Sequence, residues 1–267
     1  MLSFLTVNIG AASRTRAEAM LGWLAKRPED LFLLTETSAG PGTDYLLAQF
    51  RNAGYAVVHT PGANGDRGTA LVSRVKLHPG PFQHFTEVSL PGRLAGAVLD
   101  TEPRVVVLCV YVPSRDRSLD KTEKKQAFIA SLLAGLDVLP DELRGRLVIG
   151  GDYNVIARSH VPLHPGFLPF EFSLLEGLEQ RGFVDPHQLC VPGEQAYSWI
   201  GRTGDGYRYD YFHVGRELHA LVRSCAYLHE TREQRLTDHA AMTLALDVVA
   251  TKPLSASGAT VEDATLF

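Results

Sequence analysis

Short apolar or β-branched runs recur along the whole chain, separated by polar segments that contain turn-forming residues. Runs of this length and composition are typical of buried β-strands. The predicted strands are 2–7, 30–34, 55–59, 69–73, 105–110, 147–149, 209–214 and 242–248. Strands therefore dominate the predicted secondary structure.

Helical spacing of apolar residues appears between some of these strands. The predicted helices are 17–25, 44–51, 122–136 and 172–180. The segment 75–110 is instead nearly all strand and turn, with hairpins predicted at Pro79-Gly80 and Pro91-Gly92, which disfavours a purely parallel doubly wound sheet. The pattern favours an α/β (α+β) fold, a four-layer sandwich of two mixed β-sheets packed face to face with helices on the outer faces.

The domain organisation follows from length and from the lack of internal boundaries. A chain of 267 residues is long enough for one large α/β domain. Neither a repeat of fixed period nor a linker divides it. We therefore predict a single domain over 1–249, and we expect 250–267, which turns small and polar, to be a flexible C-terminal tail.

Composition narrows the class of protein. Apolar residues make up 45% and charged residues 21%, so neither disorder nor a fibrous repeat is indicated. The formal net charge of −4 argues against coating of nucleic acid and leaves only a local basic groove for a phosphate backbone. No secretory signal, membrane span or protein partner is indicated. Isolated Cys109, Cys190 and Cys225 favour reduced thiols and a cytoplasmic enzyme.

Polar or acidic side chains stand directly at the ends of several predicted strands. Asn8 ends the first strand, and Glu36 follows the second. Such positions can face a ligand, but each residue alone is more simply explained as a capping or loop residue.

The segment 146–154 reads RLVIGGDYN, a strand that enters two glycines predicted to permit a tight turn. Asp152 and Asn154 follow two positions apart and share a face in extended geometry. The carboxylate can accept a proton or hold a water, and the amide can donate to a phosphoryl oxygen. An equally good explanation is a Gly-Asp turn with Asn154 in a left-handed conformation.

Two acidic residues near the end of the sequence are candidate partners for a histidine. Asp210 lies within RYDYFHV, and Asp238 directly precedes His239 before another strand. A histidine near neutrality can change protonation, and a carboxylate commonly fixes its tautomer. A structural histidine is the alternative.

Taken in order, Asn8, the LTE that ends at Glu36, the YVP of Tyr111, GDYN, RYDYF and TDHA resemble the endonuclease/exonuclease/phosphatase superfamily with the deoxyribonuclease I-like fold. Each motif is weak alone, but their order over residues 8–239 makes the resemblance specific. Within the superfamily, the chain is most similar to the exonuclease III and abasic-site endonuclease branch, through segments 110–116, 166–185, 196–199 and 206–212.

The resemblance implies a Mg²⁺ or Mn²⁺ ion on hard oxygen ligands, with Glu36 as the principal ligand and with Asn8 and Asp238 completing or orienting the site. It also implies catalytic roles for a further set of residues. Asp210 would fix His239 against the scissile phosphate, and either Asp152 or His239 would take the proton from water. Asn154 and Tyr111 would steady the developing oxyanion.

The substrate side of the site is predicted from aromatic and basic residues. Trp199, Tyr207 and Phe167 could stack on a base or fill the space of a missing one, although core packing explains them equally well. Arg202 and Arg208 could hold flanking phosphates. The alternatives are solvated charges or, for Arg208, support of Asp210.

We therefore expect a metal-dependent phosphodiester hydrolase, with DNA as the substrate and exonuclease III or abasic-site endonuclease activity. A phosphatase or phosphodiesterase for a small-molecule or lipid phosphoester is the alternative. It is favoured by the acidic balance and by departures from that branch, namely Thr35, the missing Lys after Glu36, and Pro186-His187-Gln188. A catalytically inactive binding scaffold is disfavoured, because every position aligned by motif holds a competent residue.

Overall fold

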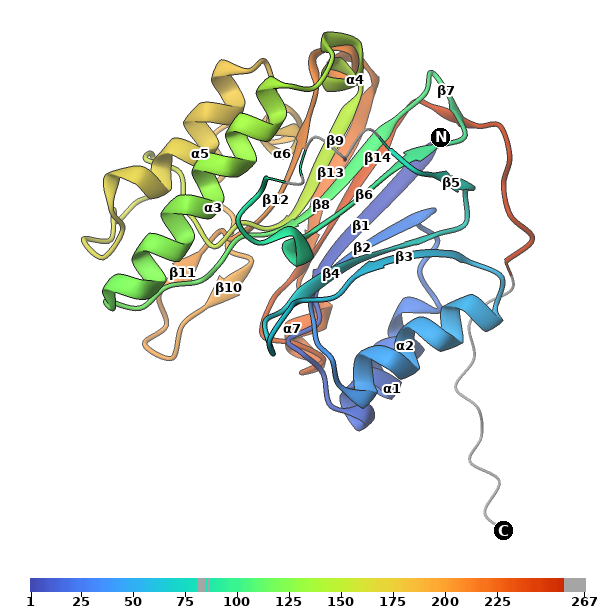
Figure 1. Ribbon diagram of the computed structural model, residues 1–267, viewed down its shortest axis with the longest axis horizontal. Helices are drawn as coiled ribbons and strands as arrows, with labels where there is room; N and C mark the ends of the chain where they lie inside the picture. Colours follow the sequence, from blue (N-terminus) through green and yellow to red (C-terminus); the bar gives the residue numbers. More distant parts are fainter. Residues whose placement is uncertain (81–84, 86, 257–267) are drawn as a thin grey trace.

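Two β-sheets pack face to face in a computed structural model that describes residues 1–80, 85 and 87–256 (Figure 1). The six-stranded sheet has the order β13-β14-β1-β2-β4-β3, and the five-stranded sheet has the order β12-β9-β8-β6-β5. Each sheet is mixed, because β1 pairs in parallel with β2 and β8 with β9, whereas the other pairs are antiparallel. The four-layer sandwich predicted from the sequence is confirmed.

The strands of the larger sheet are β1 (Leu2–Asn8), β2 (Leu31–Thr37), β3 (Ala56–Thr60), β4 (Gly68–Ser73), β13 (Val222–Leu228) and β14 (Ala241–Leu246). Those of the smaller sheet are β5 (Leu77–His78), β6 (Leu94–Leu99), β8 (Val106–Tyr111), β9 (Leu147–Asp152) and β12 (Asp210–Val214). Two further strand pairs join β10 (Trp199–Ile200) to β11 (Gly206–Tyr207) and β7 (Thr101–Glu102) to β15 (Val249–Ala250).

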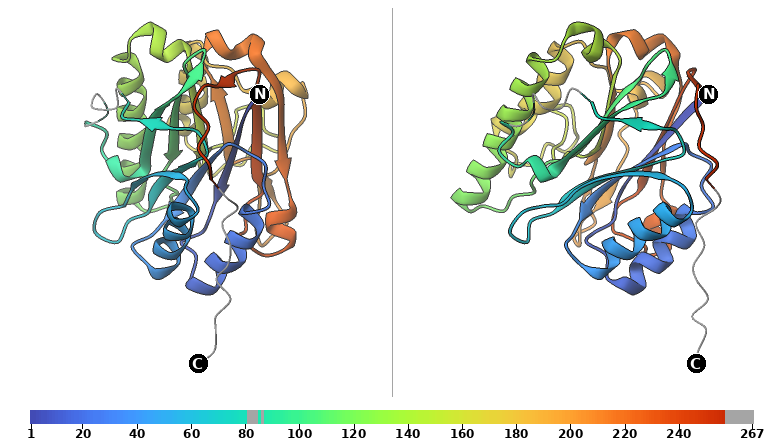
Figure 2. Two further views of the ribbon diagram at one scale, coloured as in Figure 1. Left: turned by 90° about the vertical axis from the view of Figure 1, so that its right-hand side faces the viewer. Right: turned by 45° about the vertical axis from the view of Figure 1, so that its right-hand side comes forward.

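Helices cover both outer faces of the sandwich, as the right-hand view of Figure 2 shows. The helices α1 (Arg14–Leu24) and α2 (Pro41–Asn52) lie on the larger sheet, and α3 (Leu119–Asp137) and α5 (Pro169–Gln180) lie on the smaller one. Shorter helical segments are η2 (Pro91–Arg93), α4 (Asp141–Gly145), α6 (Pro186–Cys190), η3 (Arg216–Leu221) and α7 (Glu230–Glu233).

Three apolar layers explain why the strand sequences are nearly continuous apolar runs. On β1, Phe4 points between the sheets, whereas its neighbour Leu5 points toward α1 and α2. On β8, Val107 points between the sheets and Leu108 toward α3 and α5. Because successive side chains alternate and both faces are covered, few polar residues are tolerated within these strands.

Local differences from the predicted elements have physical causes. Pro91-Gly92 begins η2 rather than a hairpin, and the strand that pairs with β5 begins only at Leu94, so Pro79-Gly80 does not close a tight turn. The edge strand β13 escaped prediction because most of its residues are partly or fully exposed and its apolar pattern is weak.

The chain beyond residue 249 continues along the sandwich in its described part. Val249 and Ala250 pair with β7, and the backbone N–H of Leu254 donates to the carbonyl of Arg74 at 2.6 Å. The remainder of the predicted tail, 257–267, lies outside the described residues. Within the described part of the chain, no helix has the length and apolar character needed to cross a membrane.

Candidate active site

The parallel pairing of β1 and β2 brings two of the predicted residues together at one end of the larger sheet. Asn8 ends β1 opposite Thr35 of β2, and Glu36 follows Thr35. The pairing register of β2 shifts between Thr35 and Thr37, and Glu36 there has a φ of 55°. A left-handed conformation is rare for a residue with a side chain and occurs preferentially at functional sites. The bulge directs the Glu36 carboxylate toward Asn8.

The antiparallel pairing of β9 and β12 supplies the acidic residues of the smaller sheet. Asp152 and Asp210 stand directly opposite each other in the register, and both are buried. The two glycines before Asp152 lie within β9 and do not form the predicted turn. Gly151 has a φ of 143°, and a Cβ there would lie 2.0 Å from the Val110 carbonyl oxygen. Glycine is therefore required for close approach of β8, not for chain reversal.

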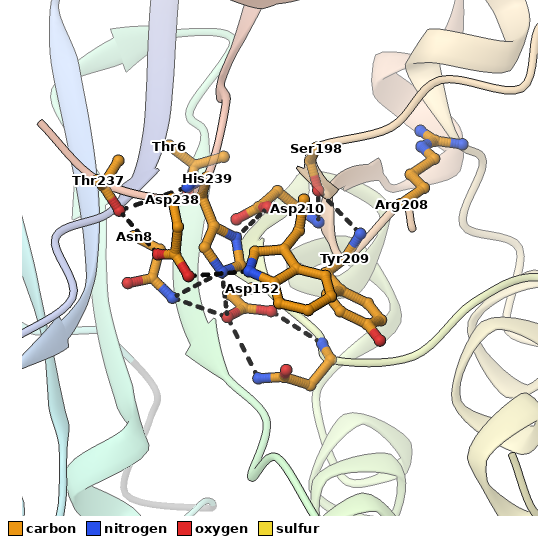
Figure 3. A network of polar contacts seen from close by, with 12 residues as sticks. Thr6, Asn8, Asp152, Ser198, Arg208, Tyr209, Asp210, Thr237, Asp238 and His239 are labelled. Atoms are coloured by element: carbon orange, nitrogen blue, oxygen red, sulfur yellow. Dashed lines mark hydrogen bonds and ion pairs between the residues drawn. The ribbon is translucent and has the colours of Figure 1, made fainter. Parts of the chain in front are cut away.

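The Asn8 amide links the two sheets. Its Nδ2 lies 3.0 Å from Oε1 of Glu36. The same atom lies 2.9 Å from Oδ2 of Asp152 and 3.5 Å from Nε2 of His239 (Figure 3). Its Oδ1 accepts a hydrogen bond of 2.8 Å from the backbone N–H of Gly10, which fixes the amide orientation. Asn8 thus presents its donor, not its oxygen, to the carboxylates.

The predicted Asp-His pair is present in the structure. Oδ2 of Asp210 lies 2.7 Å from Nδ1 of His239, and Nε2 of His239 lies 4.0 Å from Oδ2 of Asp152. Burial disfavours the imidazolium, but the carboxylates of Asp210 and Asp152 outweigh burial and raise the pKa of His239 to about 10. The ring is therefore a buried cation with its Nε2–H directed toward the cluster.

Asp152 is surrounded by like charges in a buried position. Burial raises the pKa of this carboxyl group to about 7 against the attraction of His239, and Asp210 and Glu36 add to the rise. A carboxylate whose pKa is shifted toward neutrality is suited to accept a proton near neutral pH.

Asn154 holds the Asp152 carboxylate from the other side. Its backbone N–H donates to Oδ1 of Asp152 at 2.9 Å, and its Nδ2 lies 3.2 Å from Oδ2 of Asp152 and 3.0 Å from the Val112 carbonyl. Asn154 has a φ of 50°, so the left-handed conformation considered from the sequence is present together with a role at the site.

Tyr111 contacts Glu36 rather than pointing away from the cluster. Its hydroxyl donates to Oε1 of Glu36 at 2.8 Å, and burial, followed by the charges of Glu36 and Asp152, raises the pKa of the phenol. The guanidinium of Arg93 lies 4.3 Å from the centre of the Tyr111 ring. Tyr111 therefore stays protonated and fixes one oxygen of Glu36.

The predicted ligand Asp238 lies at the exposed rim. Its Oδ2 accepts a hydrogen bond of 2.8 Å from Nε1 of Trp199. Burial opposes ionisation, but this bond and the charge of His239 lower the pKa of the carboxyl group overall. Asp238 is thus an ionised group beside an aromatic residue at the entrance.

An aromatic surface adjoins the cluster. The rings of Tyr207 and Tyr209 are stacked with centroids 5.3 Å apart, and Trp199 lies 5.7 Å from Tyr207. Phe167 lies 6.2 Å and His164 lies 4.4 Å from Tyr207. These five rings, named here the aromatic rim, are all partly exposed. Tyr209 and His164 were not singled out from the sequence.

The two arginines predicted to contact phosphates differ in environment. Arg202 is exposed in the turn between β10 and β11. Arg208 is buried, makes two hydrogen bonds to Asp185 of 2.5 and 2.9 Å, and donates to the Tyr227 hydroxyl at 2.6 Å. That hydroxyl donates to the carbonyl of Asp210 at 2.6 Å. These bonds agree with the alternative predicted for Arg208, support of Asp210, and its phosphate contact stays a prediction.

Two residues that sequence reasoning missed fix the backbone of the Asp-His pair. Oγ1 of Thr231 donates to the carbonyl of His239 at 2.7 Å, and Oγ of Ser198 accepts from the N–H of Asp210 at 3.0 Å. Ser198 lies within the AYSW segment, but nothing in the local sequence identifies Thr231, because its contact depends on the fold.

Three ligand-type atoms, one each from Asp152, Asp210 and His239, lie within 4.8 Å of one another. In the metal-free protein the imidazole of His239 is protonated on both nitrogens, so an ion held by this group would have to displace a proton from it. Glu36 offers a better donor, because both hydrogen bonds it receives go to Oε1 and, among the described residues, Oε2 receives none.

Comparison with known proteins assigns this chain to a family. A sequence model of the endonuclease/exonuclease/phosphatase family matches residues 5–240. No curated protein sequence matches the chain.

Similar solved structures include NExo, a 3′ phosphatase from Neisseria bound to a product DNA hairpin (23% identity, TM-score 0.76), and an AP endonuclease from Archaeoglobus fulgidus (22%, 0.77). For both, the match covers 92% of this chain and 100% of the other. The AP endonuclease LMAP from Leishmania major is 20% identical with a TM-score of 0.68, over 92% of this chain and 87% of its own. At these identities the likeness establishes the fold.

Proposed function

Because this chain belongs to the endonuclease/exonuclease/phosphatase family and is thus a phosphoester hydrolase, we propose that it is a divalent-metal-dependent phosphodiesterase that cleaves DNA. The proposed activity is of the exonuclease III or abasic-site endonuclease type. Structural neighbours named as AP endonucleases, and one bound to a product DNA hairpin, support DNA as the substrate class. The three free cysteines support our prediction of a cytoplasmic enzyme.

One observation supports the proposal most strongly. The Asn8 amide donates hydrogen bonds to both Glu36 and Asp152, next to the Asp210–His239 pair. Residues from both sheets converge here, and the aromatic rim adjoins them through the hydrogen bond of Trp199 to Asp238. A structural polar cluster would balance its own charges, whereas this one leaves carboxylates in excess.

The donor set fits a hard divalent cation. Glu36, Asp152 and Asp210 place three carboxylates around one imidazole, and none of them is hydrogen-bonded by a lysine or arginine of the described residues. Oxygen ligands with uncompensated negative charge suit Mg²⁺ or Mn²⁺. When bound, such an ion compensates charge on the phosphate and polarises it. Glu36 would hold it through Oε2, with Asn8 orienting this carboxylate and Asp238 nearby.

The residues of the chain divide the remaining tasks. Asp152, held by Asn8 and Asn154, would orient the attacking water and accept its proton. His239, charged and fixed by Asp210, would donate from Nε2 to a phosphoryl oxygen. Asn154 and Tyr111 are already bonded to Asp152 and Glu36, so any help to the oxyanion would require them to share these bonds with the substrate.

The aromatic rim and Arg202 are the proposed substrate contacts beyond the reacting phosphate. The partly exposed rings of Trp199, Tyr207 and Phe167 can stack on an unpaired base or fill an abasic gap. Arg202 in the exposed turn can reach a flanking phosphate.

A small phosphoester remains the second candidate substrate. The observation that favours it is the ion pair of the buried Arg208 with Asp185, because Arg202 is then the one arginine of the two predicted that is open to solvent. A DNA backbone is ordinarily held by several basic contacts.

Substrate choice can be tested with one panel. We expect the purified protein with Mg²⁺ or Mn²⁺ to cleave a duplex with a single abasic site or a 3′ end, and to turn over bis(p-nitrophenyl) phosphate slowly. A chelated sample is the control for metal dependence. Turnover of small esters with no product from abasic, nicked or plain duplex would overturn the DNA assignment.

A further inference from the structure

A buried network of charged side chains contacts the backbone of Asn154. Nζ of Lys125, on α3, donates to the carbonyl of Asn154 at 2.6 Å and to Oε1 of Glu171, on α5, at 2.7 Å. Oε2 of Glu171 accepts two hydrogen bonds from Arg115, of 2.9 and 2.7 Å. Lys125 and Glu171 are each 1% exposed. None of these three residues has a task in the proposed chemistry.

Burial of a lysine is costly unless its charge is paired and its donors are satisfied. Burial lowers the pKa of Lys125, and the adjacent Glu171 carboxylate opposes this shift. The ion pair with Glu171 explains why the charge is tolerated. It does not explain why the second hydrogen bond goes to the carbonyl of Asn154.

The backbone at Asn154 needs support. Its φ of 50° is less favourable for an asparagine than the right-handed region. Both of its donors toward Asp152, the backbone N–H and Nδ2, depend on that conformation. A relaxed backbone would turn the amide away from Asp152 and leave the carboxylate held by Asn8 alone.

We propose that Lys125 is a positioning residue for the reaction. It fixes the carbonyl of Asn154, which keeps this residue left-handed, and thereby holds Asp152 in the orientation that serves the attacking water. The inference rests on the proposed function, because it assigns a consequence for turnover. Its structural part, the hold on Asn154, can be measured without any activity.

Two variants separate this role from the stability of the ion pair. Glu171→Gln removes the charge pair, and Lys125, whose pKa burial already lowers, can lose its proton and still donate to the Asn154 carbonyl as a neutral amine. The double variant Lys125→Met with Glu171→Gln contains no buried unpaired carboxylate at this place and lacks the bond to Asn154. Because the two proteins differ only at Lys125, their comparison isolates it, and the double variant avoids the misfolding risk of Lys125→Met alone.

We expect the double variant to have a kcat at least about tenfold below that of Glu171→Gln, with KM within about twofold, because misplacement of Asp152 acts on the chemical step. We expect Mn²⁺ affinity to be equal in the two, since Glu36 is not touched. Hydrogen exchange of the Asn154 backbone N–H should be about tenfold faster in the double variant.

Turnover and hydrogen exchange at Asn154 test two different claims. Absence of phosphodiesterase activity in the wild-type protein would overturn the proposed function, while the exchange rates would still decide whether Lys125 holds Asn154. Equal exchange at Asn154 in the two variants would overturn the positioning role. If the enzyme is active and the two variants have equal kcat values, the proposed effect of Lys125 on turnover is overturned.

Discussion

The candidate catalytic cluster (Asn8, Glu36, Asp152, Asp210 and His239) and the cluster around Arg208 both include or contact residues of β12, and they differ in the balance of their charges. In the candidate catalytic cluster, Asp152 and Asp210 face a single cation, His239, and Glu36 adds a further negative charge near Asp152. A buried carboxylate without a partner cation is destabilising, and the raised pKa of Asp152 reports that cost.

The second cluster is balanced. The buried Arg208 and the partly buried Asp185 form an ion pair with two hydrogen bonds, and Nε of Arg208 donates to the Tyr227 hydroxyl. Burial opposes ionisation of Asp185, but the charge of Arg208 and hydrogen bonds from this side chain and from the backbone together lower the pKa of the carboxyl group. The comparison teaches that burial and hydrogen bonding do not distinguish a functional cluster from a structural one, whereas an unbalanced charge does.

The largest expected effect is at the unbalanced cluster. Asp152→Asn should lower kcat by about 10³-fold, because the proposed base is removed. It should also raise the free energy of unfolding of the metal-free protein by about 1 kcal/mol at pH 8, because the pKa of Asp152 is raised and its ionised form destabilises the fold above that pKa.

Kinetics and urea denaturation in a chelating buffer measure both quantities on the same preparation. A protein that loses stability together with activity would place Asp152 in the structural class and would remove the contrast between the clusters.

At the balanced cluster, a substitution should lower stability strongly and turnover only slightly. Asp185→Asn leaves Arg208 buried without its counterion, which should lower the free energy of unfolding by about 3 kcal/mol. Turnover per folded molecule should change less than about threefold, since Asp185 does not contact the catalytic groups. Denaturation and active-site-normalised kinetics provide the check. A loss of kcat comparable with that of Asp152→Asn would show that this cluster serves catalysis.

The smallest effect concerns His213, next to the balanced cluster on β12. Burial lowers the pKa of His213 to about 4, and the charges of Asp185 and Arg208 act in opposite directions. The folded state therefore favours the neutral ring, so the stability contribution is complete above the unfolded pKa of about 6.5 and is lost as the pH falls toward 4.

Between pH 7 and pH 5, wild-type protein should lose about 2 kcal/mol more unfolding free energy than His213→Phe. Denaturation of both proteins across this interval gives the difference, which cancels the other titrating groups. Parallel curves for the two proteins would contradict the burial of a neutral ring.

The pattern of apolar strands was enough to predict much of the fold and several residues of the candidate site. Contacts between residues far apart in the sequence could not be predicted in this way. Asn8 and Glu36 could be grouped from sequence because both follow apolar runs, and the ends of neighbouring parallel strands meet at one edge of a sheet. The hydrogen bond from the Asn8 amide to Asp152 could not be predicted, because it joins residues of two sheets that are 144 positions apart in the sequence.

The environment of Arg208 shows the same limit. Arg208 has the sequence context of a surface residue near an active site, and its partner Asp185 is 23 positions away. Lys125 was passed over within an ordinary amphipathic helix, because only the packing of α3 against α5 reveals that this position is buried. Local pattern identifies groups that can do chemistry, and tertiary packing decides which of them are free to do it.

The central claim, that Glu36 holds the divalent cation needed for phosphodiester cleavage, is tested most directly by a Mg²⁺ titration of abasic-duplex cleavage by wild-type and Glu36→Gln protein. We expect wild-type activity to vanish in chelator and to saturate with Mg²⁺, and we expect Glu36→Gln to fall about 10³-fold or more at all Mg²⁺ concentrations while it unfolds at the wild-type temperature. Undiminished cleavage in chelator, or a wild-type Mg²⁺ response from Glu36→Gln, would contradict the account.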